Sequence, residues 1–174
     1  MNDQLPGWLP LRHVADLASS VSRAELSERI GTAFLVLVSG ELARPVPMQR
    51  TVTWEDSSTP TLETGFFVAR LAPKAPGVRT ISLGRTTNND VVLVDNTISK
   101  VHAFLHRDWQ GTGTAISDAQ SHNGTFVEGA RVATRGDGSP TPLTSGQSVR
   151  LGSVALTFLV LDDVLALGRT LKPA

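Results

Sequence analysis

The sequence predicts a mainly β protein, a sandwich or barrel of short strands with helical segments at both ends. Short apolar runs recur from residue 66 onward, and glycines separate one run from the next. Many short strands at regular spacing are typical of sandwiches and barrels. Helical periodicity is confined to the first 30 residues and to a short stretch near the C-terminus.

The composition indicates a globular protein whose anion binding, if it has any, must be local. The chain has 174 residues, of which 40% are hydrophobic and 18% charged, and its formal net charge is +0. A neutral protein offers no long-range attraction for nucleic acid or for an anionic membrane. The absence of cysteine excludes disulfides, thiolate zinc sites and cysteine nucleophiles.

The N-terminal third predicts two short helices and a strand. Apolar residues with helical spacing form one stripe, made of Val14, Leu17, Ala18 and Val21. Ser22 and Glu25 form a capping box that starts a second helix, and Gly31 is suited to end it. An apolar run over residues 34–38 favours a buried strand. Because the helices are too short to be stable alone, we expect this part to pack on the main domain.

The next tract, residues 41–65, is rich in proline, serine and threonine, which is typical of a linker or loop. Within it, residues 51–54 predict one short strand. We therefore divide the chain into a helical extension with its linker (residues 1–64), a β domain (residues 65–161), and a C-terminal helix with a tail (residues 162–174). The pair Asp162-Asp163 is expected to cap that last helix.

The β domain is predicted from nine short runs. They cover residues 66–71, 79–83, 91–94, 102–108, 114–118, 125–127, 130–133, 147–151 and 154–161. In the last run both alternating sets of residues are apolar. That strand is therefore expected to be central in its sheet or covered on its outer face, with the N-terminal helices as the obvious cover.

Three polar clusters lie in predicted turns of this domain, where side chains are free to meet a ligand. They are Gly84-Arg85, Ser99-Lys100-Val101-His102 and Ser121-His122-Asn123-Gly124-Thr125. Together they supply a guanidinium, a hydroxyl, an ammonium and an amide, which suit a phosphate attached to a peptide. The ordered pattern G-R, S-K-x-H and S-x-N-G-T resembles the forkhead-associated (FHA) family of phosphothreonine-binding modules.

The resemblance implies an FHA-type β-sandwich of about ten or eleven strands and a role for each clustered residue. Phosphopeptide contacts are implied for Arg85, Ser99, Lys100, His122 and Asn123. Structural roles at the site are implied for Gly84, His102, Gly124 and Thr125. The family more often has arginine at the second position of S-K-x-H, so the lysine keeps the charge but lacks the planar fork.

A fourth element, residues 143–152, is similar to the closing hairpin of the family. Gln147 stands where the family usually has an acidic residue, which puts one turn hydrogen bond in question. The resemblance covers residues 65 to 161 and leaves the N-terminal third outside it.

The implied function is phosphothreonine-dependent binding of a peptide or protein in Ser/Thr kinase signalling. The partner would be a phosphothreonine-containing protein, either such a kinase or its substrate, with no cofactor, metal, nucleic acid or membrane. The alternative is an FHA-like scaffold or oligomerisation module with a phospho-independent contact.

The chain shows no catalytic motif, which disfavours an enzyme. A two-histidine metal site at His102 and His106 is geometrically conceivable but lacks a third ligand. With no signal peptide or spanning segment, we expect a cytoplasmic protein.

Overall fold

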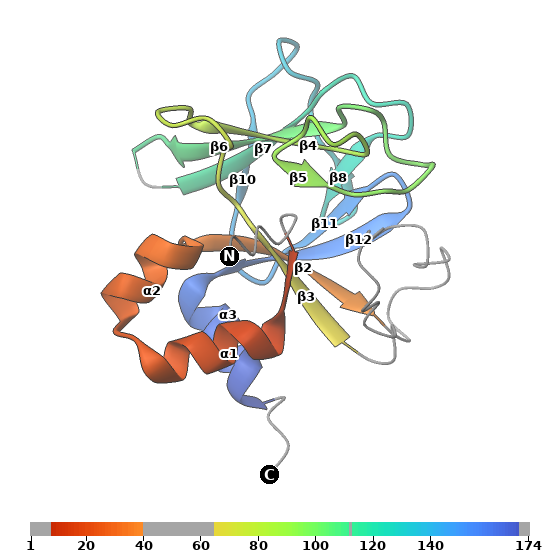
Figure 1. Ribbon diagram of the computed structural model, residues 1–174. Coiled ribbons are helices and arrows are strands. Elements are labelled where there is room, and N and C mark those ends of the chain that lie inside the picture. Colours follow the sequence, from red (N-terminus) through yellow and green to blue (C-terminus); the bar gives the residue numbers. More distant parts are fainter. Residues whose placement is uncertain (1–7, 40–64, 112, 171–174) are drawn as a thin grey trace.

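The computed structural model describes residues 8–39, 65–111 and 113–170 of the chain. These residues form two facing β-sheets with helices on the outside of the larger sheet (Figure 1). The prediction of a mainly β sandwich with helices at both ends is therefore confirmed. The strand expected over residues 51–54 lies outside the described residues.

The larger sheet has seven strands in the order β1-β3-β2-β12-β11-β8-β9. Their bounds are β1 (Trp8–Pro10), β3 (Gly65–Arg70), β2 (Ala33–Ser39), β12 (Val154–Val160), β11 (Ser148–Leu151), β8 (Thr125–Val127) and β9 (Ala130–Arg131). All of its neighbouring strands are antiparallel. The strand expected over residues 34–38 is thus β2, which lies between β3 and β12. The β domain predicted to begin at residue 65 therefore shares a sheet with strands from the predicted extension.

The smaller sheet has five strands in the order β10-β7-β6-β4-β5. Their bounds are β10 (Thr141–Leu143), β7 (Gly113–Asp118), β6 (Ala103–Trp109), β4 (Thr80–Gly84) and β5 (Val91–Val92). Only the β4/β5 pair in this sheet is parallel. The described residues thus hold twelve strands. Sequence reasoning did not predict β1 and β10, which are both three-residue edge strands that contain a proline, Pro10 and Pro142. Proline cannot donate to a ladder, so it suits an edge and obscures the strand pattern.

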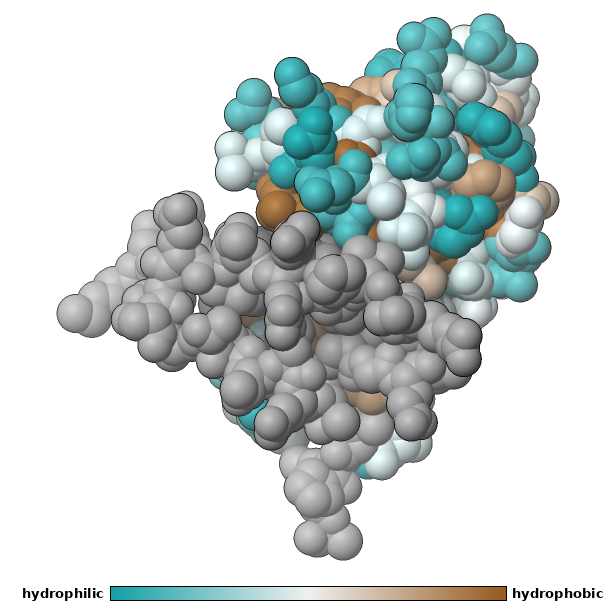
Figure 2. All heavy atoms as spheres, turned by 90° about the vertical axis from the view of Figure 1, so that its right-hand side faces the viewer, coloured by the Kyte–Doolittle hydropathy of each residue, from teal (hydrophilic) through white to brown (hydrophobic). Residues whose placement is uncertain are grey.

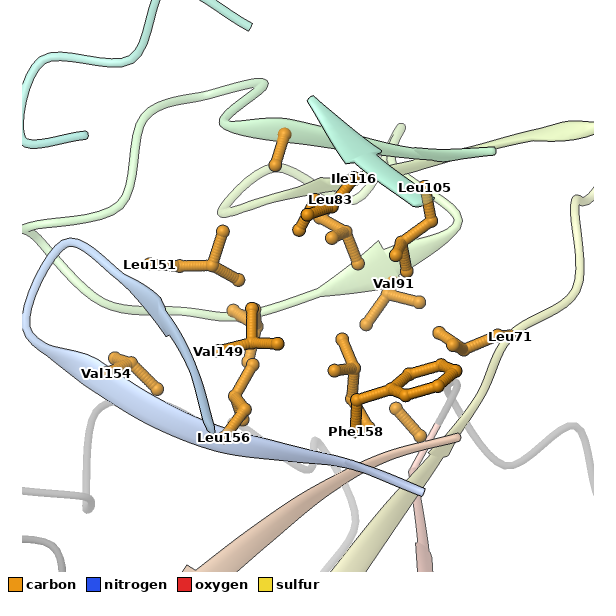
Figure 3. Packing of buried hydrophobic residues seen from close by; sticks show 14 of the residues in the cluster. Leu71, Leu83, Val91, Leu105, Ile116, Val149, Leu151, Val154, Leu156 and Phe158 are labelled. Atoms are coloured by element: carbon orange, nitrogen blue, oxygen red, sulfur yellow. The ribbon is translucent and has the colours of Figure 1, made fainter. Parts of the chain in front are cut away.

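The main hydrophobic core fills the space between the two sheets (Figure 3). Leu83, Leu105 and Ile116 enter it from the smaller sheet, and all three are completely buried. Leu156 and Phe158 meet them from β12 in the larger sheet. In β2 the residues alternate between two layers, since Leu35 and Leu37 face this core and Phe34 and Val36 face the opposite side. The two sheets are thus held together by apolar packing between their facing sides.

Three helices cover part of the outer face of the larger sheet (Figure 1). They are α1 (Leu11–Ser20), α2 (Arg23–Ile30) and α3 (Leu161–Thr170). The predicted cap of α2 is present, because the Ser22 side chain accepts a hydrogen bond from the backbone N–H of Glu25, and Gly31 ends the helix with φ of 92°. The capping role expected for the Asp162-Asp163 pair is wrong. The helix α3 begins at Leu161, so both carboxylates lie in its first turn.

The helices and the sheet share a second apolar cluster, which we call the helical layer. Its buried members are Leu11, Val14, Leu26, Ile30, Phe34, Val36, Val68, Leu161 and Val164. This confirms that the N-terminal helices pack on the sandwich. The expectation that β12 is central in its sheet or covered is met, because β12 is the middle one of the seven strands, while the helices cover its outer face only in part. On the outer face of this strand, Leu159 packs under the helices but Ala155 is exposed. Among the described residues, the helices therefore cover one end of the outer face and not the other end, over β11, β8 and β9.

Candidate phosphate-binding site

The three predicted clusters lie in loops at one end of the sandwich, which we call the loop cluster. It contains the loop after β4 (residues 84–90), the loop before β6 (residues 93–102) and the turn between β7 and β8 (residues 119–124). The described part of the face in Figure 2 is mainly hydrophilic, with scattered apolar spots. Of the large hydrophobic residues described, only three valines are exposed, and Val101 at 41% is the one within the cluster.

The absence of a side chain at Gly84 lets two loops touch. A Cβ there would meet the backbone carbonyl oxygen of Lys100 and would lie 2.7 Å from Nδ2 of Asn89. Such a contact is far too short for two heavy atoms. The next residue, Arg85, donates its backbone N–H to the carbonyl oxygen of Ser99 at 3.1 Å. The close approach of the backbones at Gly84 therefore places Arg85 beside Ser99.

Ser99 and Lys100 present their polar groups from the second loop. The hydroxyl oxygen of Ser99 accepts a hydrogen bond from the backbone N–H of His122 at 3.0 Å. Because the oxygen is the acceptor there, the hydroxyl hydrogen remains available to donate outward. Lys100 is exposed, and its backbone carbonyl accepts from the Asn89 amide at 2.6 Å. The backbone of this loop is therefore fixed, while its donors face solvent.

His102 joins the second loop to the third from a completely buried position. Its Nδ1 accepts the backbone N–H of Ser99 at 3.0 Å, so the neutral ring carries its hydrogen on Nε2. Nε2 lies 3.1 Å from the carbonyl oxygen of Gly124 and donates to it. Burial lowers the pKa of His102, although the hydrogen bond to Gly124 and the negative charge of Asp118 act in the opposite direction. The neutral imidazole is thus the form that this geometry requires.

The third loop is held by a buried carboxylate. Asp118, 2% exposed, accepts hydrogen bonds from the Ser121 hydroxyl at 2.6 Å, the Thr125 hydroxyl at 2.7 Å and the Ser121 backbone N–H at 2.9 Å. Several charge-assisted hydrogen bonds to one carboxylate offset the cost of burying it. Gly124 closes the turn with φ of 81°, in the left-handed region that favours glycine. This network aims Asn123 and His122 outward, and both are exposed.

Asn123 is partly engaged within the protein. Its Nδ2 donates to the carbonyl oxygen of Thr97 at 2.8 Å, which ties the third loop to the second. The side-chain oxygen has no hydrogen-bond partner among the described residues. An amide in this arrangement still offers one acceptor and one hydrogen to a ligand.

The structure thus brings together all five residues expected to contact a ligand. A chain of hydrogen bonds runs from the backbone of Arg85 through Ser99 to the backbone of His122, and Asn123 follows directly. Among the described residues, the side chains of Arg85, Lys100 and His122 make no hydrogen bond or ion pair. The ion pairs found there, Arg23–Asp162 and Arg29–Glu25, both lie in the helical segments. Two unpaired cations with a hydroxyl between them favour an anion.

Sequence reasoning missed the residues that hold this geometry. Asn89 is 1% exposed and donates to Thr86 as well as to Lys100, while its side-chain oxygen has no partner among the described residues. Asp118 precedes the third cluster by three residues, and only its contacts reveal its function. The concern about Gln147 is wrong, because its side-chain oxygen accepts the backbone N–H of Thr144 at 2.8 Å. An amide oxygen thus makes the bond expected of a carboxylate.

Other kinds of site find little support in the described residues. The rings of His102 and His106 are bound to different partners, since His106 Nε2 lies 2.8 Å from the Ser117 hydroxyl. Within residues 8–39, 65–111 and 113–170, no group of three or more His, Cys, Asp or Glu could hold a metal ion. None of the helices in the same ranges has the length and apolar character to span a bilayer.

The sequence model of the FHA domain matches residues 81–152, which include every residue of the loop cluster discussed above. This segment of the chain belongs to the FHA domain family, whose domains are binding modules rather than enzymes. The recognition made from the three clusters is therefore confirmed.

Individual relatives show the same likeness. The ABC transporter ATP-binding/permease protein Rv1747 of Mycobacterium tuberculosis is 35% identical over 105 residues, which cover 60% of this chain and 10% of the transporter. This chain thus spans about a tenth of the length of that curated relative. The FHA-2 domain of the same transporter, solved by NMR, is 36% identical, with 51% of this chain and 73% of that domain covered and a TM-score of 0.38. Mycobacterium tuberculosis EmbR, in complex with a low-affinity phosphopeptide, is 29% identical, with 48% and 20% covered and a TM-score of 0.41.

Proposed function

We propose that the loop cluster binds phosphothreonine in a peptide or protein and so acts in Ser/Thr kinase signalling. One observation carries this proposal: two exposed cations, Arg85 and Lys100, lie on loops that meet at a serine hydroxyl free to donate, and hydrogen bonds fix these loops. A preorganised set of donors loses little entropy when it binds a dianion. The match of the same segment to the FHA family supports it.

Each residue then has a distinct task. The guanidinium of Arg85 forms a two-pronged contact with phosphate oxygens, Ser99 donates its hydroxyl hydrogen, and Lys100 adds charge. Asn123 binds the peptide backbone with its remaining donor and acceptor. His122, which precedes it in the turn, lies next to the phosphate. The resemblance further implies a preference for phosphothreonine over phosphoserine, since a threonine methyl can fill a small apolar space.

The test is a calorimetric titration with a phosphothreonine peptide, its phosphoserine form and its unmodified form. In the wild-type chain only the phosphorylated forms should bind, and phosphothreonine more tightly. Arg85→Ala should cost roughly 2–5 kcal/mol of binding, because it leaves a bound phosphate without its main partner. Arg107→Ala is the matched control, since Arg107 is an exposed arginine near the opposite end of β6. Equal affinity of Arg85→Ala and wild type would show that Arg85 is not the main phosphate contact.

The partner that fits is a phosphothreonine-containing protein in the cytoplasm, either a Ser/Thr kinase or a substrate of one. The division of the chain at residues 65 and 161 remains a proposal, and β2 argues that the folded unit extends N-terminal to residue 65. The alternative function is a scaffold or oligomerisation module with a phospho-independent contact. Tight binding of an unmodified protein partner, unaffected by Arg85→Ala, would favour that alternative.

A further inference from the structure

Three residues form a row across the open end of the larger sheet, next to the loop cluster. Phe126 on β8 lies directly opposite Arg150 on β11 and opposite Arg131 on β9. Residues that are opposite one another in antiparallel strands point to the same face. The neighbours Thr125 and Val127 are buried, so the row lies on the outer face. We call this row the arginine platform.

The phenylalanine ring orients the guanidinium of Arg150. The Cζ atom of Arg150 lies 3.8 Å from the centroid of the Phe126 ring, which is a close cation–π contact. One N–H of the same guanidinium donates to the carbonyl oxygen of Gly152. Stacking on a ring fixes the plane of the group and leaves its edge open to other acceptors. Arg150 is therefore oriented before any ligand arrives.

Arg131 connects the platform to the site. A Cβ placed on Gly124 would lie 3.3 Å from both Cζ and Nε of Arg131, and 3.0 Å from Cε2 of Phe126. The guanidinium thus occupies the space that the missing side chain of Gly124 leaves. Gly124 directly follows Asn123, the residue proposed to bind the peptide backbone. A peptide that passes over Asn123 meets Arg131 next.

The platform carries charge without an acidic partner. Neither Arg131 nor Arg150 is in an ion pair among the described residues, where the pairs are Arg23–Asp162 and Arg29–Glu25. Glu128, in the hairpin turn between β8 and β9, has a carboxylate oxygen that accepts the backbone N–H of Ser148. Guanidinium edges bind carboxylates with two parallel hydrogen bonds. Two arginines without an acidic partner, one of them oriented by stacking, therefore suit acidic side chains beside a peptide site.

We propose that the arginine platform binds aspartate or glutamate side chains of the phosphopeptide, in the segment that continues beyond Asn123. This inference rests on the proposed function and specifies its substrate class: phosphothreonine with acidic residues on one side. From Arg131 to Arg150 the platform spans two strand spacings, about 10 Å. An extended peptide covers that span with about three residues. The selected acids therefore lie in one short run, not on both sides of the phosphothreonine.

The test measures fluorescence anisotropy with three phosphothreonine peptides. One has neutral flanks, one has three acidic residues before the phosphothreonine, and one has three after it. Wild type should bind one of the two acidic peptides about two- to fivefold more tightly than the neutral one, the range expected for exposed ion pairs. Arg131→Gln should abolish that preference. Arg107→Gln, on the far part of β6, should keep it.

The outcomes separate this inference from the proposed function. Equal affinity of wild type for all three phosphopeptides, or an unchanged preference in Arg131→Gln, overturns the arginine platform and leaves phosphothreonine binding intact. If no phosphopeptide binds, the proposed function fails and the platform fails with it. Arg150→Gln is a second variant, whose thermal melting is checked because the side chain is half-buried. It should also weaken the preference, and retention of the full preference in that variant counts against the platform.

Discussion

The helical layer and the loop cluster are held together by different forces. In the helical layer, buried side chains such as Leu26, Phe34 and Val164 are apolar. In the loop cluster, the buried groups that hold the loops are polar, namely Asn89, His102 and Asp118. Apolar packing is non-directional and supplies most of the free energy of folding. Buried hydrogen bonds contribute less energy but require one geometry. The first region should therefore govern stability, and the second the position of the binding groups.

The largest expected effect on stability comes from the helical layer. Leu26 in α2 is 1% exposed, and Leu26→Ala would leave a cavity between the helix and the sheet. Such a change costs roughly 2–5 kcal/mol of unfolding free energy. Because the loop cluster is at a different place in the fold, the remaining folded protein should bind phosphopeptide as wild type does. Urea unfolding combined with calorimetry checks both parts. A large loss of affinity in the folded variant would show that the two regions are coupled.

A smaller loss of stability, with a loss of binding, is expected at His102. His102→Leu fills the same space with an apolar side chain of similar size. It leaves the N–H of Ser99 and the carbonyl of Gly124 without their partner. Each unsatisfied buried group costs about 1–3 kcal/mol, but part of this cost is recovered when the groups find other partners, so we expect a smaller loss than for Leu26→Ala. The loops would relax to find other partners, so Ser99 and Asn123 would move apart and phosphopeptide affinity should fall. Urea unfolding and calorimetry measure the two effects. If stability falls and affinity does not, His102 supports the core alone.

The contrast between the regions also explains what the sequence could reveal. Apolar periodicity gives the helices and most strands, because burial repeats with the geometry of each element. The loop motifs indicate Arg85 and Ser99, since turn residues stand out between apolar runs. The arginine platform could not be found in the same way. Its three residues are brought into one row by the register of β11, β8 and β9, and register depends on pairing between distant segments.

The buried polar residues that hold the loops could not be identified from the sequence for a related reason. Asp118 ends a predicted strand and Asn89 lies in a predicted turn, so neither stands out in the sequence, and the importance of each comes from side-chain hydrogen bonds that form only in the folded chain. The short edge strands β1 and β10 lack the alternation that marks longer strands. Sequence patterns therefore predict the elements better than the contacts that join them.

Lowering the pH is expected to have a still smaller effect on folding stability. Burial lowers the pKa of His102 and of His106, and for His106 the charge of Arg135 adds to this. Both rings therefore stay neutral in the folded protein below the ordinary pKa of about 6.5, where the unfolded chain already takes up protons. The free energy of unfolding should therefore be highest above about pH 6.5 and fall as the pH decreases from there. Each histidine contributes about 1.4 kcal/mol to this fall for each unit by which folding lowers its pKa.

Urea midpoints between pH 7.5 and 5 measure this dependence. The carboxylates with lowered pKa, Asp90 and Asp162, lose their contribution only at lower pH, so they do not interfere. His102→Leu should have a shallower slope than wild type. A slope that is the same in His102→Leu would remove His102 as a source of the acid sensitivity.

The smallest effect is expected at the ion pair between α2 and α3. Arg23 donates two hydrogen bonds to Asp162, at 2.9 and 2.7 Å, and these bonds lower the pKa of the carboxyl. Both side chains are 65% exposed, however, so water and salt screen the attraction and the ordering of two side chains opposes it. Arg23→Ala should leave the melting temperature almost unchanged, like Arg29→Ala at the other exposed pair. A fall as large as that of Leu26→Ala would mean that charge, and not apolar packing, fixes the helices to the sheet.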